Sequence, residues 1–180
     1  SHCYGGDEYQ QYLGNFKGGI MFNLGCHFID FIVALLGRPC GIVSFLKPAP
    51  HYPDHIKNNC LAILEYPQAT ATLRASSKEA GGLERRRLKI CGMKGSLELC
   101  PLERFDNQPL EMRLTLDVGN PDYPAGTHMA SFGVRSDRYQ DQLLEFASMI
   151  RGEMGNLYSY EHDYLAQAVL LSASGYEEWK

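Results

Sequence analysis

The sequence lacks the short motifs that mark most nucleotide and metal sites. It contains no G-x-G-x-x-G fingerprint, P-loop, H-E-x-x-H motif or C-x-x-C pair. Strands and helices do not alternate along the chain, so it carries no recognisable dinucleotide-binding unit of its own. His51 and His55 have a spacing that suits a metal pair on a helix, but Pro53 between them favours a loop. We therefore expect no metal site.

Charge and cysteine usage exclude further classes of partner. The net charge is −4, which gives no support for nucleic acid or an anionic membrane as a partner. The apolar run over 28–36 contains Asp30 and is far too short to span a bilayer. The N-terminal residues are polar and do not resemble a signal peptide. Six scattered cysteines favour free thiols in a reducing, cytoplasmic setting over a disulfide framework.

The hydrophobic pattern changes along the chain from helix to strand and back to helix. Residues 1–16 are expected to form an irregular arm, and 24–36 a helix that ends at Gly37. Apolar side chains surround this helix almost completely, which predicts burial on most sides. Patterns of period two predict strands at 40–47, 58–66, 69–76, 86–91, 96–100 and 110–118. Residues 119–136 are expected to form a long surface loop.

Two amphipathic helices are predicted to complete the chain, capped by Asp137 and Ser159. The apolar stripe expected on the first of them consists of Tyr139, Leu143, Phe146, Ala147 and Ile150. Residues 1–180 are predicted to be one domain of the α+β class. It would consist of a mostly antiparallel open sheet of about six strands, with helices packed on one face.

Three polar side chains interrupt an apolar segment near the N-terminus. Asn23, His27 and Asp30 stand at positions i, i+4 and i+7, and therefore share one face of a helix. His27 lies in the first turn, where the positive helix end favours the neutral imidazole that accepts a proton. Asp30 is suitably spaced to hold its tautomer, and Gly18-Gly19 nearby leaves room for a substrate. The alternative is a structural histidine that is merely hydrogen-bonded by a neighbour.

The same segment carries a resemblance to a known family. Lys17 to Asp30, followed by Leu35-Leu36-Gly37, resembles the G-G-x-x-x-D-x-G-x-H-x-x-D segment of the Gfo/Idh/MocA oxidoreductases. These are relatives of glucose–fructose oxidoreductase and inositol dehydrogenase. Residues 90–97 resemble a strand turn of that family, and 138–146 resemble its R-Y-x-x-Q-L-x-x-F helix. The match runs in order over 12–176.

The resemblance implies a C-terminal domain of the glyceraldehyde-3-phosphate dehydrogenase type. Such a domain supplies the substrate pocket and commonly the oligomer interface, while an N-terminal Rossmann domain binds NAD or NADP and supplies a catalytic lysine. That Rossmann domain is expected to be missing from this chain, which alone would bind no cofactor and be inactive.

By the same resemblance, His27 would exchange a proton with the substrate and Asp30 would support it. Lys17 and Asn23 would join His27 in binding a small substrate, a sugar, polyol or related hydroxy compound. The family usually has aspartate where this chain has Asn23, and asparagine cannot carry negative charge.

Two other interpretations are left open. One is a non-catalytic sheet module for protein association, supported by a polar strand face made of Thr70, Thr72, Arg74 and Ser76. A homo-oligomer through this sheet face fits both this interpretation and the oxidoreductase one. The other is a stand-alone hydrolase or isomerase, which would need His27 and Asp30 in a closed pocket.

Overall fold

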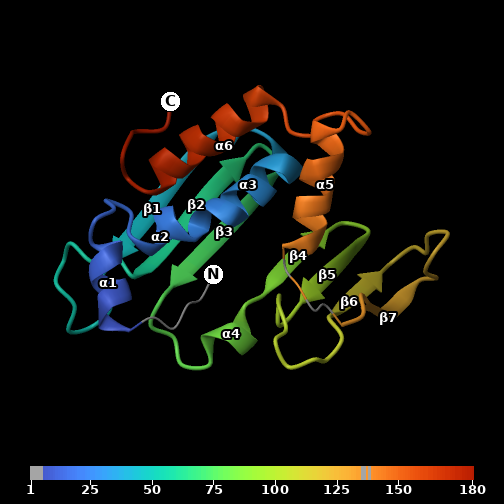
Figure 1. Cartoon of the computed structure of the whole chain (residues 1–180). Coiled ribbons are helices and arrows are strands. Elements are labelled where there is room, and N and C mark those ends of the chain that lie inside the picture. Colours follow the sequence, from blue (N-terminus) through green and yellow to red (C-terminus); the bar gives the residue numbers. More distant parts are fainter. Residues whose placement is uncertain (1–5, 135–136, 138) are drawn as a thin grey trace. The chain divides into compact units, whose positions relative to one another are not determined.

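The computed structural model describes residues 6–134, 137 and 139–180, and it divides the chain into two compact units (Figure 1). The first unit takes in Ser1–Gly82 and Leu157–Lys180, and the second takes in Leu83–Asn156. Among the described residues, no helix is both long and apolar enough to cross a membrane.

The first unit is built on a three-stranded antiparallel sheet. Its strands are β1 (Gly41–Lys47), β2 (Asn59–Tyr66) and β3 (Ala69–Ser76), in that order across the sheet. All three lie within one residue of the predicted ranges. Residues alternate between a buried and a more open face, as expected for a sheet covered on one side.

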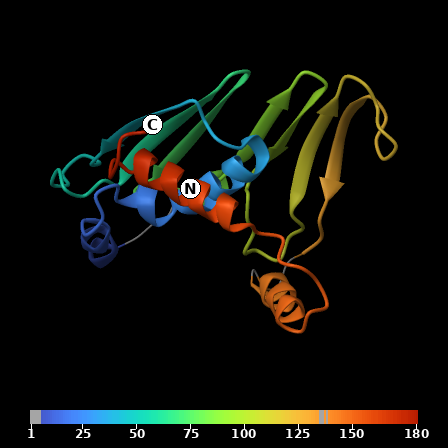
Figure 2. The same cartoon turned by 90° about the horizontal axis from the view of Figure 1, so that it is seen from above.

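Helices cover one face of this sheet, as predicted (Figures 1 and 2). They are α2 (Ile20–Asn23), α3 (Gly25–Leu36) and α6 (Tyr160–Ala173), and α3 and α6 pack beside each other. Their contact with the sheet forms a core whose fully buried side chains include Ile20, Met21, Ile29, Leu64 and Val169. This layer of helices holds the residues of the candidate site.

Helix α3 is buried along one face only, so the prediction of burial on most sides is wrong. Gly25, Ile29 and Val33 face the core, while Phe31 and Leu35 are 40% and 53% exposed. The helix lies on a single sheet layer, and its outer side remains exposed among the described residues of the first unit. Its end was predicted correctly, since Gly37 follows it with φ +72°.

The N-terminal arm is not irregular as predicted, because α1 (Asp7–Leu13) is helical. Gln10 of this helix is fully buried, and its Oε1 accepts hydrogen bonds from Asn58 Nδ2 and Ser77 Oγ, each at 2.8 Å. Asn58 and Ser77 flank β2 and β3. A satisfied buried amide therefore ties the arm to the end of the sheet.

The second unit contains a four-stranded antiparallel sheet. Strands β4 (Leu88–Gly92), β5 (Gly95–Leu99), β6 (Glu111–Leu116) and β7 (Gly126–Ser131) follow one another across it. Strand β7 lies within the stretch predicted to be a loop, so that prediction is wrong. The α+β class is confirmed, with the described residues forming seven strands in two sheets.

Helices α4 (Gly82–Arg85) and α5 (Gln140–Ile150) complete the secondary structure. The N-cap of α5 is Tyr139 and not Asp137 as predicted. The Asp137 carboxylate still accepts hydrogen bonds from the backbone N–H groups of Tyr139 and Gln140, at 2.7 and 3.2 Å. The predicted stripe on α5 is exposed: the solvent-accessible fractions of its large side chains lie between 57% and 71% (Tyr139, Leu143, Phe146, Ile150).

The Gly18-Gly19 turn fixes the start of α2 by a very close backbone approach. Gly19 has φ +51°, and a Cβ atom there would lie 2.0 Å from the carbonyl oxygen of Lys57. The same oxygen accepts the N–H of Ile20 at 2.8 Å. A Cβ atom on Gly18 would lie 2.4 Å from Cβ of Ser174 at the end of α6. Neither position has room for a side chain.

We expect Gly19→Ala to lower the free energy of unfolding by about 2–4 kcal/mol, because it adds both a left-handed backbone penalty and a clash with the Lys57 carbonyl. Urea denaturation followed by circular dichroism measures this. Gly155→Ala is the control, since a Cβ atom there meets nothing within 4 Å. Equal stability of the two variants would contradict the packing described for the turn.

Candidate functional site

Three of the four predicted site residues lie on α2 and α3. Asn23 is the last residue of α2, His27 stands in the first turn of α3, and Asp30 follows one turn later. His27 is exposed, because it points away from the sheet: it precedes the buried Ile29 by two residues, which turns it to the opposite side of the helix.

The side chain of Asn23 is held by α1. The hydroxyl of Tyr9 donates a hydrogen bond to Asn23 Oδ1 at 2.8 Å, and the side chain is half-buried. Its backbone carbonyl accepts the Cys26 thiol at 3.4 Å. Burial raises the pKa of the Cys26 thiol, and the Asp30 charge raises it further. Cys26 is therefore a neutral thiol and a poor nucleophile, although it lies next to His27.

Asp30 is paired with a second histidine. Its Oδ1 lies 2.7 Å from Nε2 of His162, in the first turn of α6. The backbone N–H of His162 donates to Ser159 Oγ at 3.1 Å, which confirms Ser159 as the N-cap of that helix. Within the described part of the chain, the His27 ring has no hydrogen-bond partner. Support of His27 by Asp30 stays a prediction.

No pattern in the sequence indicates the Asp30–His162 contact, since the two residues are 132 positions apart. The Asp30 side chain is 58% exposed and that of His162 is 20% exposed. A pair with this much solvent contact stabilises a fold only weakly. Its clear structural effect is to join the first turn of α6 to the middle of α3.

Lys17 precedes the glycine turn and has an exposed side chain. Its backbone N–H donates to the hydroxyl of Tyr176 at 3.0 Å, which links the turn to the segment after α6. The predicted substrate contact of Lys17 remains a prediction.

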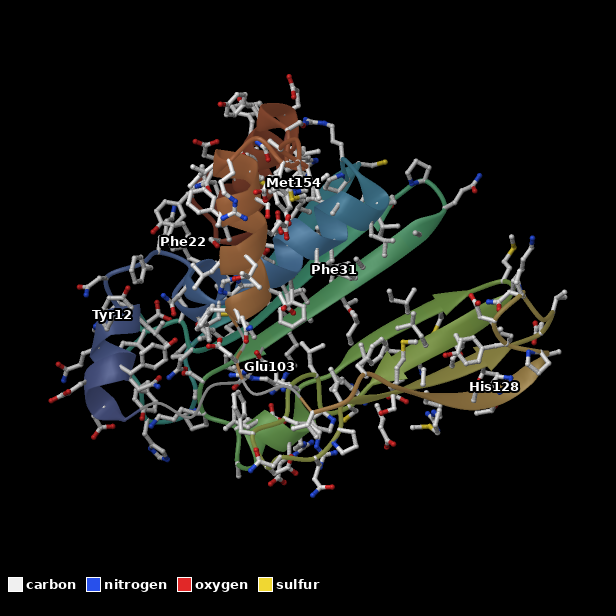
Figure 3. The ribbon with its side chains drawn as sticks, turned by 45° about the vertical axis from the view of Figure 1, so that its right-hand side comes forward. Tyr12, Phe22, Phe31, Glu103, His128 and Met154 are labelled. Carbon is white, nitrogen blue, oxygen red and sulfur yellow. The ribbon has the colours of Figure 1, made fainter. Side chains whose placement is uncertain are left out.

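A row of aromatic rings borders Asn23, and the sequence interpretation missed it. Successive ring centroids are separated by 5.1 to 6.2 Å, and two of the members, Tyr12 and Phe22, are labelled in Figure 3. The members are Tyr9, Tyr12, Phe16, Phe22 and Tyr176. The helical spacing of the first two residues was the available signal.

The glycines near His27 have a packing explanation. Gly18 and Gly19 are required by the contacts with Ser174 and Lys57, and a Cβ atom on Gly25 would lie 2.8 Å from Met21 Sδ. The sequence interpretation took these glycines as a sign of room for a substrate. Their packing contacts explain them without a substrate. Among the described residues there is also no group of three or more side chains suited to hold a metal ion.

Comparison with known proteins identifies the family. The chain matches the sequence profile of the GFO/IDH/MocA C-terminal domain over residues 3–98, which is more than half of its length. It belongs to this family. A comparison with curated proteins gave no match.

Three solved structures illustrate the similarity of this Gfo/Idh/MocA domain to larger proteins. An Agrobacterium radiobacter oxidoreductase in complex with NAD+, L-tartaric acid and magnesium is 18% identical, with a TM-score of 0.61 over 85% of this chain and 45% of its own. A Klebsiella pneumoniae protein assigned to the oxidoreductases is 18% identical, with a TM-score of 0.63 over 87% of this chain and 47% of its own.

A Desulfitobacterium hafniense protein assigned as an NADPH-dependent oxidoreductase is 20% identical, with a TM-score of 0.60 over 87% of this chain and 45% of its own. At these identities the likeness shows the fold. The chain spans about half the length of all three structures.

A double-mutant cycle distinguishes the two possible partners of Asp30. Using Asp30→Asn with His162→Gln, we expect a coupling of about 0.5 kcal/mol in the free energy of unfolding at low salt, at a pH where histidine is protonated. The matched cycle with His27→Gln is expected to give no coupling beyond error. A larger coupling to His27 than to His162 would contradict the pairing described above.

Proposed function

We propose that this chain is the substrate-binding domain of an NAD(P)-dependent oxidoreductase, and that it works together with a nucleotide-binding domain. The main support for this proposal comes from the residues on the outer face of α3. There the exposed His27 shares the helix surface with Phe31 and Leu35, two apolar side chains that remain 40% and 53% exposed. An apolar surface around a proton-handling group is typical of one wall of a pocket that another structure must close.

Family membership and chain length support this proposal. The chain belongs to an oxidoreductase family and spans about half the length of the similar solved structures. One of those was solved with NAD+ and L-tartaric acid, a small hydroxy acid. We accordingly propose that the substrate is a small hydroxy compound, either a sugar, a polyol or a related acid. We also propose a cytoplasmic setting.

Three residues of the chain would have separate roles at the substrate. A nicotinamide held by the partner domain would supply the hydride chemistry. His27 takes a proton from the substrate hydroxyl during oxidation, or returns it to the carbonyl oxygen during reduction. Asn23 binds a substrate oxygen beside it, and Asp30 holds α3 and α6 together behind them.

A stand-alone hydrolase or isomerase is less well supported. That chemistry needs a closed pocket around His27 within this chain. His27 is exposed on the outer face of α3, so the residues described in the first unit form one wall beside it and do not enclose it.

The open face of the first-unit sheet favours a further role in self-association. Val43 and Phe45 on β1 are 56% and 49% exposed, and they pair across the sheet with Ile63 and Leu61 on β2. Cross-strand neighbours of this kind form a continuous apolar surface. We propose that it is the contact surface of a homo-oligomer.

The catalytic proposal is tested on the longer protein that includes the nucleotide-binding domain, using NADH or NADPH absorbance and a panel of hydroxy acids, polyols and sugars. His27→Gln is expected to lower kcat by about 10²- to 10⁴-fold, because glutamine does not transfer the proton, while nucleotide binding is unchanged. His55→Gln, in an exposed loop, is the control. A protein that binds neither nucleotide, or a His27→Gln variant with full activity, would refute the proposal.

The association proposal is tested by sedimentation equilibrium of this chain. We expect Phe45→Lys to weaken self-association about thirtyfold, since it places a charge at the centre of the apolar surface. Val118→Lys changes an apolar residue that is 68% exposed and lies outside the sheets, and it should leave association intact. A wild-type chain that stays monomeric at high concentration would rule out this interface.

A further inference from the structure

The hydrogen bond between Tyr9 and Asn23 determines which atoms of the Asn23 amide are available to a ligand. The Tyr9 hydroxyl donates to Oδ1 at 2.8 Å, which turns the amide oxygen toward Tyr9 and uses one of its two lone pairs. The Nδ2 group then remains, with two N–H donors. Over the described residues, Nδ2 has no hydrogen-bond partner.

The Asn23 side chain is also partly accessible. The buried side-chain polar atoms without a partner, among the residues that the structure describes, belong to Ser44, Glu145 and Ser174. Asn23 is not one of them, and its side chain is half-buried. Part of the Asn23 side chain is therefore open to solvent.

We infer that Tyr9 is a positioning residue that orients the Asn23 amide so that its nitrogen faces the substrate, and that the two N–H donors favour a carboxylate or carbonyl oxygen of the ligand over a hydroxyl. The inference rests on the proposed function, which places Asn23 in the substrate site. An aspartate at this position would offer acceptors and select a ligand hydroxyl; Asn23 reverses this polarity. A carboxylate gains most from the change, because hydrogen bonds to a charged acceptor are stronger than those to a neutral one.

The geometry around Tyr9 makes this orientation stable. Tyr9 is half-buried and stacks on Tyr12, with a ring-centroid distance of 6.2 Å. The backbone of Asn23 is fixed as well, since its N–H donates to Gly19 O at 3.0 Å. Both ends of the hydrogen bond are thus held by contacts that do not involve the ligand.

The orientation is tested first by NMR of the ¹⁵N-labelled chain, in which Asn23→Asp identifies the Asn23 side-chain amide signals by deleting them. Tyr9→Phe keeps the ring and removes only the hydroxyl, so we expect these signals to shift and broaden as the amide gains rotational freedom. Tyr12→Phe is the matched control, since it removes the hydroxyl of the neighbouring tyrosine in the same row. Asn23 signals that are the same in Tyr9→Phe and wild type would overturn the inference.

Selectivity is tested by titrating the chain with L-tartrate and with L-threitol, in which two CH₂OH groups replace the carboxylates. Wild type and Tyr12→Phe should bind tartrate about tenfold more tightly than threitol, with shifts at the Asn23 amide, and Tyr9→Phe should lose most of this preference. Asn23→Asp should favour threitol. A preference for tartrate that is unchanged in Tyr9→Phe, or Asn23 signals that do not respond to tartrate, would overturn the inference.

These titrations require no nicotinamide nucleotide, so the two proposals fail separately. If the longer protein shows no oxidoreductase activity but the Tyr9-dependent preference is present, the proposed function is wrong and the selectivity stands. If the longer protein is active and the preference is unaffected by Tyr9→Phe, the function stands and the inference about Tyr9 is wrong.

Discussion

The approach of the Gly18-Gly19 turn to the backbone of Lys57 determines where every residue of the candidate site lies. Gly19 adopts φ +51° and leaves no space for a Cβ atom beside the Lys57 carbonyl, which at the same time accepts the first N–H of α2. From this fixed start, α2 is only four residues long and leads directly into α3. The contact of Gly19 with the Lys57 carbonyl therefore fixes the positions of Asn23 and His27. A larger residue in the turn would displace both.

The chemistry follows from which side of α3 is left open. One face of the helix packs against the core, and α6 contacts an adjacent side through Asp30 and His162. His27 lies on the remaining outer face, beside exposed apolar residues. The exposed histidine has no catalytic environment until another surface excludes water from it. This is why we propose that the chain supplies one half of an oxidoreductase site. It belongs to the Gfo/Idh/MocA C-terminal domain family.

Local patterns in the sequence predicted those elements whose stability is local. The period-two runs placed the strands of the first sheet within one residue, and Gly37 marked the end of α3. Contacts between distant segments were not predictable. Gln10 of α1 is buried, and its Oε1 accepts hydrogen bonds from residues that flank β2 and β3. Strand β7 likewise pairs with β6. The pairing of Asp30 with His162 likewise requires α3 and α6 to meet first.

The most direct test of this account measures how fast diethyl pyrocarbonate modifies His27, by mass spectrometry, in this chain alone and in the longer protein with nicotinamide nucleotide and substrate. His55, in its exposed loop, provides the internal reference. We predict rapid modification in the isolated chain and a rate roughly tenfold slower in the longer protein, because a closed pocket removes most of a group's contact with solvent. Equal rates of His27 modification in the two proteins would contradict the claim that a nucleotide-binding domain completes this site.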